Sequence, residues 1–440
     1  MSVSAPCIAY LASGAGGMYC GSCLRDNTLA AALQECGVDM QLIPTYTPIR
    51  TDEEDVSIDR VFFGGVSVYL RHRFPVLKFL PRGLDQVLDQ PGLLRWITRR
   101  NLSTDAARLG PLAVSMLRGT AGEQRRAVEQ LVNWLTTDSR PQLVNLSNLL
   151  IAGCVPTLKQ ALGVPVLVTL QGDDLFIAGL VEPYRSRVLG LLRDLVPLVD
   201  GFIVFNEFYL ERMSELLAIP RDKMHVVPLG INLDDFPAKV PTRSSRPLTV
   251  GYLARLCHAK GLHLLVDAFL ELRQRPGLEN LQLKIAGWLG ESDSAYYESE
   301  VKKIRTANAG DCFSYEGVLD REQKVAFLKS LDVLSVPTVY EEAKGIYVLE
   351  SLACGVPVVQ PRHGSFPELL TATGGGRLCE PHDSQCLAGE LEKLLRDNEL
   401  RAELGRTGQQ NVQQCRHARA MALATLSVYQ HYLPGQPERR

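Results

Sequence analysis

At 440 residues the chain is too long for one hydrophobic core and fits about two domains of roughly 200 residues each. Hydrophobic residues make up 46% of the chain and charged residues 22%, which is ordinary for a globular protein. The formal net charge of −2 excludes a general attraction to nucleic acid or to membranes, so a partner has to be recognised by local features.

The chain has eleven cysteines, an odd number, scattered through apolar or helical contexts. This usage suits a reducing compartment better than a disulfide framework. The first residues lack a basic segment before their apolar run, and no later stretch is long enough for a membrane-spanning helix. We therefore expect a cytoplasmic protein.

The chain begins with a predicted strand, helix and second strand. Residues 7–12 are an apolar run, the glycine-rich residues 13–17 follow, and a helical pattern covers 24–37 before a strand at 40–44. Glycines between a strand and a helix let the backbone approach a diphosphate. The spacing departs from the dinucleotide-binding fingerprint, and no acidic residue ends the second strand where a partner for the ribose would be expected, so this loop alone does not name the ligand.

Cys20 and Cys23 stand in that loop with the spacing of a redox pair, and a helix N-terminus lowers a thiol pKa. The chain is too long for a thioredoxin-like fold, and no second pair completes a zinc site of about four ligands. We favour a structural or substrate-loop role, and Asp26 and Asn27 could face an acceptor.

Residues 60–126 carry twelve lysines and arginines against four acids, a net charge of +8. An alternating, strand-like pattern at 61–70 and helical patterns at 103–117 and 123–135 lie in or beside this stretch. We favour a solvated insertion. The alternative is a basic surface that makes a peripheral contact with the inner face of a membrane and holds an anionic or lipid-linked acceptor.

Three further strands, at 143–150, 164–170 and 201–205, alternate with helical patterns and continue a doubly wound sheet, which 225–230 completes. Polar residues follow two of these strands, where a carboxylate or amide could orient a sugar hydroxyl. Polar residues also cap helices at such points, so this alternative stays open. The candidate acceptor contacts are Gln171, Asp173, Asp174 and Asn206.

A stretch rich in proline, serine and threonine, 237–247, is predicted to link two domains. The strand at 248–253 leads to Arg255 and Lys260, just before a helix at 262–273. Cations at this spacing can converge on one diphosphate, the guanidinium through paired hydrogen bonds and the ammonium as a point charge. Exposed surface cations are the alternative.

Residues 331–336 are a predicted buried strand, and a loop with Glu342 and a helix follow until Gly355. Glu342 would face the near part of a ligand that lies over the strand ends. Glu350, about one turn inside the helix, would reach the more distant part of the same ligand. The amides of Gly345, Ile346 and Tyr347 would face an anion between the two carboxylates. This arrangement suits a nucleotide sugar, and solvated carboxylates at a helix start are the alternative.

The order Pro, Glu, Gly, Glu and Ala-Cys-Gly-Val-Pro-Val-Val within 337–360, with Arg, four residues and Lys-Gly at 255–261, resembles the signature of family 4 of the retaining glycosyltransferases. The resemblance is specific over 248–361 and looser before it. It implies an α/β protein of the GT-B fold, in which two doubly wound Rossmann-like domains face a central cleft.

The implied domains are an acceptor-side domain at 1–236, the linker, and a nucleotide-sugar-binding domain at 248–417. A final helix, within 418–440, would cross back to the first domain.

The resemblance also implies roles for single residues. Many family members have a histidine where this chain has Gln171, and the Gly-Asp-Gly that often follows the strand at 281–287 is replaced by Trp288-Leu-Gly. The implied donor-site residues are Gly16 and Gly17 at the donor, Arg255 and Lys260 at the diphosphate, Glu342 at the donor sugar, Glu350 at the ribose and Val318 beside the base.

We expect a retaining hexosyltransferase that uses a nucleotide-diphosphate sugar and a glycan, lipid-linked or small-molecule acceptor, without metal, cofactor or nucleic acid. Arg255, Lys260 and Glu342 are its predicted catalytic residues. The alternatives are a sugar-nucleotide epimerase or a phosphorylase of the same fold, or a non-catalytic binding protein, which would be marked by loss of these charged residues.

Overall fold

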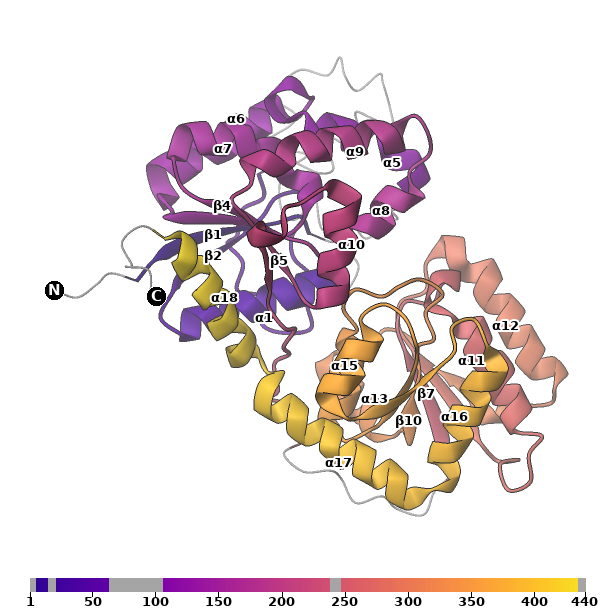
Figure 1. The fold of residues 1–440 in the computed structure, drawn as a ribbon. Coiled ribbons are helices and arrows are strands. Elements are labelled where there is room, and N and C mark those ends of the chain that lie inside the picture. Colours follow the sequence, from indigo (N-terminus) through magenta and orange to yellow (C-terminus); the bar gives the residue numbers. More distant parts are fainter. Residues whose placement is uncertain (1–4, 15–20, 63–105, 238–246, 434–440) are drawn as a thin grey trace. The chain divides into compact units, whose positions relative to one another are not determined.

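A computed structural model describes residues 5–14, 21–62, 106–237 and 247–433 of the chain (Figure 1). Their contacts divide the chain into two compact units, of which the first comprises Met1–Pro228 and Arg419–Arg440 and the second Leu229–Ala418. Each unit contains its own six-stranded sheet.

The first sheet has the strand order β2-β1-β3-β4-β5-β6, and every pair in it is parallel. β3, β4 and β5 are buried along their whole length, and β1 is buried from Ile8 on, because helices cover both faces, and this explains the unbroken apolar runs in the sequence. The strands are β1 (Cys7–Ala12), β2 (Asp39–Pro44), β3 (Leu143–Leu146), β4 (Val166–Thr169), β5 (Gly201–Val204) and β6 (Met224–Val226).

Helices α1 and α18 lie on one face of this sheet, and α6, α7 and α9 lie on the other (Figure 1). The last helix of the chain thus belongs to the first unit. The helices are α1 (Gly21–Glu35), α5 (Ala106–Leu117), α6 (Arg125–Trp134), α7 (Val155–Leu162), α8 (Asp173–Gly179), α9 (Tyr184–Leu195), α10 (Glu207–Leu217) and α18 (Ala418–Tyr432).

Two strands of this unit end well before their predicted bounds. The strand predicted at 225–230 is β6, which ends at Val226, and Pro228 beyond it has no amide to donate to a neighbouring strand. The predicted strand at 143–150 ends at Leu146, because the side chain of Asn148 accepts a hydrogen bond from the Leu150 amide and caps the 3₁₀ helix Leu149–Cys154.

The second sheet is also wholly parallel and has the order β12-β11-β10-β7-β8-β9. The strand predicted at 331–336 pairs over two residues only, although the Ser335 amide still donates to the Gly251 carbonyl. The strands are β7 (Thr249–Leu253), β8 (Gln282–Ala286), β9 (Phe313–Tyr315), β10 (Val333–Leu334), β11 (Val358–Pro361) and β12 (Gly376–Cys379).

In the second unit, α11 packs against α12 and α16, and α14 and α15 pack against α17. The helices are α11 (Leu262–Leu272), α12 (Ser294–Thr306), α13 (Arg321–Lys329), α14 (Ile346–Ala353), α15 (Phe366–Thr373), α16 (Ser384–Arg396) and α17 (Asn398–Cys415).

The C-terminal helical region is broken between α17, which ends at Cys415, and α18, which begins at Ala418. The break is held by Ile231, whose amide donates to the Arg416 carbonyl at 3.0 Å and whose carbonyl accepts from the Ala418 amide at 2.8 Å. Most of the predicted insertion and linker, at 63–105 and 238–246, lies outside the described residues.

Candidate functional site

Two loops meet at the carboxyl ends of β7 and β10, which are neighbours in the second sheet. The Val339 amide donates to the Ala259 carbonyl at 3.0 Å. Gly261 has φ +73°, and a Cβ atom there would lie 1.8 Å from the Pro337 carbonyl oxygen. Only glycine allows this approach of the two backbones, and the approach brings Lys260 beside the loop that carries Glu342.

Lys260 and Glu342 form an ion pair in which Nζ lies 2.6 Å from Oε2. Their side chains are 17% and 7% exposed, so the pair is largely shielded from water. The Tyr340 hydroxyl donates to the same carboxylate oxygen at 2.8 Å. The Lys260 ammonium also lies 5.0 Å from the centroid of the Tyr340 ring and 5.4 Å from that of Tyr347.

This environment keeps Glu342 ionised. Burial alone would raise its pKa, but the charge of Lys260 and the hydrogen bonds from Lys260 and Tyr340 lower the pKa to about 2. Tyr340 was missed by the sequence reasoning. A signal for it existed, since it is an aromatic residue in a loop between a strand and a helix that already carried a candidate glutamate.

Arg255 follows β7 with an exposed side chain. Its Nε donates to Sγ of Cys257 at 3.4 Å, and among the described residues it forms no ion pair. Its guanidinium therefore keeps most of its donors for an anion at the strand ends.

The N-terminus of α14 lies in the same loop as Glu342. Gly345 has φ +74° and caps the helix, and the amides of the first helical turn have no acceptor inside the helix. The N-terminus of a helix attracts anions. Gly345, Ile346 and Tyr347 are all buried.

Glu350, further along α14, lies in a second ion pair. Nζ of Lys324, from α13, donates to its Oε1 at 2.5 Å, and both side chains are less than 10% exposed. Val318 lies just after β9 and is 44% exposed. The second unit thus brings Arg255, Lys260, Glu342 and the start of α14 to neighbouring strand ends, with Val318 beyond the edge strand.

In the first unit, several predicted site residues are buried or lie outside the described residues. Gly16, Gly17 and Cys20 lie outside the described residues. Cys23 is buried in α1. Asp26 and Asn27 are buried and bonded to internal partners, so we no longer expect them to face an acceptor.

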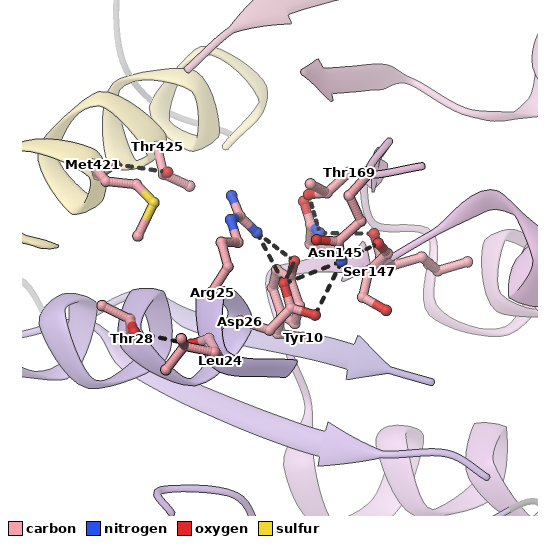
Figure 2. Close-up of polar contacts among 12 residues, drawn as sticks. Tyr10, Leu24, Arg25, Asp26, Thr28, Asn145, Ser147, Thr169, Met421 and Thr425 are labelled. Carbon is pink, nitrogen blue, oxygen red and sulfur yellow. Dashed lines mark hydrogen bonds and ion pairs between the residues drawn. The ribbon is translucent and has the colours of Figure 1, made fainter. Parts of the chain in front are cut away.

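Gln171 belongs to a buried polar cluster. Its Nε2 donates to the Ser147 carbonyl at 2.7 Å and to the Asp26 carboxylate at 3.2 Å. Asp26 also accepts from Tyr10 and from Arg25, which stacks over the ring of Phe205. Figure 2 shows Tyr10, Arg25 and Asp26 joined by hydrogen bonds, with Ser147 close to them.

The other three acceptor candidates also have structural partners. Asp173 accepts from the Leu149 and Gln171 amides, and its burial raises its pKa to about 6. Asp174 accepts from the Tyr209 hydroxyl at 2.9 Å. Asn206 caps α10. The alternative that polar residues at strand ends support the local fold thus has direct evidence here.

Among the described residues, no group of three or more His, Cys, Asp or Glu side chains is arranged to hold a metal ion. In the same part of the chain no helix combines the length and the apolar character needed to cross a membrane.

Two family profiles match the chain. The glycosyl transferase 4-like domain matches residues 27–230, and the glycosyl transferases group 1 domain matches residues 236–411. The chain belongs to the group 1, family 4-like glycosyltransferases.

Curated relatives are similar in sequence to part of this chain. A D-inositol 3-phosphate glycosyltransferase of Corynebacterium jeikeium is 31% identical over 236 residues, which are 51% of this chain and 55% of the relative. A glycogen synthase of Mycobacterium tuberculosis is 26% identical over 66% of this chain and 69% of its own length. The chain spans little more than half the length of the first of these relatives.

Solved structures extend the likeness over nearly the whole chain. A sucrose-phosphate synthase from Thermosynechococcus elongatus has a TM-score of 0.69 at 20% identity and covers 96% of this chain and 98% of its own. Anabaena HepE in complex with UDP has a TM-score of 0.65 at 15% identity, with 96% and 99% covered. These identities establish the fold alone. The prediction of a GT-B glycosyltransferase fold, with two parallel α/β sheets and a last helix that returns to the first unit, is confirmed.

Proposed function

We propose that the protein is a retaining glycosyltransferase that moves a hexose from a nucleoside-diphosphate sugar to a hydroxyl group of an acceptor. The observation that carries the proposal is the convergence of Lys260 and Glu342 next to the exposed Arg255 and the start of α14. Cations and helix amides suit a diphosphate, and a carboxylate beside them suits sugar hydroxyls. The HepE structure names UDP as its ligand, so UDP is the first nucleotide to test.

In the reaction, the bond between the sugar C1 and the diphosphate oxygen breaks, and a bond forms between C1 and the acceptor oxygen. The acceptor's proton leaves with the diphosphate. Negative charge builds up on the leaving group, so Arg255, Lys260 and the α14 amides stabilise the transition state more than the ground state.

Glu342 and Glu350 hold the two hydroxyl-rich ends of the donor. Glu342 is ionised at neutral pH and can accept hydrogen bonds from the donor sugar. Glu350 accepts from the ribose. Val318 packs beside the base. The configuration at the sugar C1 is retained because the acceptor attacks the face from which the leaving group departs.

On the acceptor side, Gln171 is the strongest of our candidates. Its Nε2 is committed to a backbone carbonyl and a carboxylate, which leaves Oε1 buried without a partner among the described residues. That oxygen is shielded from solvent, so an acceptor hydroxyl could reach it only after neighbouring side chains move. The acceptor class is a glycan, a lipid-linked glycan or a small molecule. The cytoplasmic location and the membrane contact through residues 60–126 stay predictions from the sequence.

Calorimetric titration with UDP, GDP, ADP and their sugar conjugates, in EDTA, tests the proposal. We expect saturable binding of one nucleotide, lost in Arg255→Ala and kept in Arg305→Ala, which removes an exposed arginine from α12 of the same unit. Release of free sugar from the bound conjugate then distinguishes a transferase from a binding protein. Binding of none of these ligands would reject the proposal.

A further inference from the structure

Lys324 places a positive charge on the buried face of α13. The residue is 7% exposed and lies one turn before Leu328, which is completely buried. Its Nζ donates to Oε1 of Glu350 at 2.5 Å, and the side chain of Glu350 is 8% exposed. Two ionised groups have thus been removed from water together. The desolvation of two charges offsets much of their attraction, so stability alone does not account for this pair.

Only one oxygen of Glu350 is used in this pair. Within the described part of the chain, Oε2 accepts no hydrogen bond, and it is not among the buried atoms that lack a partner. One oxygen is therefore fixed by Lys324, and the other is accessible to a ligand. A carboxylate held at one oxygen presents the second in a single orientation, which is what recognition of a hydroxyl requires.

The two helices hold their charged residues rigidly. Glu350 lies in α14, whose residues Ile346–Ala353 are all buried. Lys324 lies in the first part of α13, where Asp320 and Gln323 form a capping box that fixes the start of the helix. The distance between the two side chains is set by elements that pack in the same unit.

We propose that Lys324 is the positioning residue for ribose recognition: it orients the Glu350 carboxylate so that Oε2 accepts a hydrogen bond from a ribose hydroxyl of the donor nucleotide. The inference rests on the proposed function, because it needs a nucleotide donor. It predicts that Lys324 controls discrimination between ribonucleotides and deoxyribonucleotides without contacting either.

The experiment compares UDP with 2′-deoxy-UDP and 3′-deoxy-UDP by calorimetry, or the corresponding GDP or ADP set if another base binds. The wild-type protein should prefer the ribonucleotide over one deoxy form by about ten- to a hundredfold. In Lys324→Met, affinity for the ribonucleotide should fall to that of the deoxy form, and affinity for the deoxy form should stay unchanged. Lys329→Met, which removes an exposed lysine from the same helix, should keep the wild-type preference.

A merely structural role for Lys324 would lower affinity for all the nucleotides together, and this result would overturn the inference. The preference should also disappear in Glu350→Gln, and Lys324→Met should then cause no further loss in that background, because both residues act on the same oxygen. The double variant buries no charge at this pair, so it keeps the test valid if Lys324→Met alone fails to fold. A wild-type protein that binds no nucleotide refutes the proposed function itself, whereas a folded Lys324→Met with undiminished preference refutes only this inference.

Discussion

Nζ of Lys260 lies 2.6 Å from Oε2 of Glu342, although the two residues are 82 positions apart in the chain. The pair joins the residue that we assign to the diphosphate with the residue that we assign to the donor sugar. Donor binding has to loosen it, since the ammonium is then needed by the phosphate and the carboxylate by a hydroxyl. Until then the charge of Lys260 helps to keep the pKa of Glu342 low, and the ion pair holds both side chains in place.

The first prediction concerns the chemistry of this pair. Lys260→Ala and Glu342→Ala should each lower donor hydrolysis or transfer by at least about a hundredfold, roughly 3 kcal/mol of transition-state stabilisation, because each removes an interaction with the reacting donor. Initial rates with the bound nucleotide sugar measure the effect. Lys302→Ala, at an exposed position of α12, is the control and should be neutral. Undiminished turnover in either site variant would remove that residue from the mechanism.

The second prediction concerns pH. The pKa of Glu342 falls from an ordinary 4.5 to about 2 on folding, so its ionised form stabilises the folded state. This contribution is complete above pH 4.5 and is lost as the pH falls toward 2, and the shift corresponds to about 3 kcal/mol. Urea unfolding of the wild type and of Glu342→Gln between pH 7 and pH 3 measures it. The difference in unfolding free energy should shrink as the pH falls, and a constant difference would contradict the assignment.

The third prediction concerns the contact between the two loops. Gly261→Ala should destabilise the second unit by at least about 3 kcal/mol, because it adds a left-handed backbone cost to a clash with the Pro337 carbonyl. It should also weaken nucleotide binding by displacing Lys260. Gly277→Ala is a matched control: its φ is +85°, but a Cβ there lies 3.8 Å from its nearest neighbour. It should cost only about 1–2 kcal/mol and leave binding intact.

The fourth prediction concerns the buried cluster of the first unit (Figure 2). Arg25→Met should destabilise the unit by about 3–5 kcal/mol, because it leaves the Asp26 carboxylate buried without its charged partner. Urea unfolding followed by circular dichroism measures the loss. Arg221→Met breaks an exposed ion pair with Glu207 and should change stability little. Equal effects of the two substitutions would mean that Asp26 is not charged in the folded protein.

Much of the architecture could be read from the order of residues. The strand predicted at 7–12 agrees with β1 residue for residue, because its unbroken apolar run fits a strand that is buried on both faces. The helix after Gly345 was also predicted, since glycine at its start and Gly355 beyond its end are local signals. The strand ends that carry Arg255 and Glu342 followed from the same patterns. Local propensity and burial periodicity were sufficient for these features.

Which side chains meet depends on packing in three dimensions. No local pattern indicated that Lys260 pairs with Glu342, that Tyr340 joins them or that Lys324 pairs with Glu350, because each contact depends on how separate elements pack. The same holds for Gln171, whose neighbours come from α1 and from the end of β3. Residue order was sufficient to predict the fold class, the family and the strand ends where polar residues gather. Only packing decided the partner, the burial and the pKa of each polar group, since these depend on distances through space.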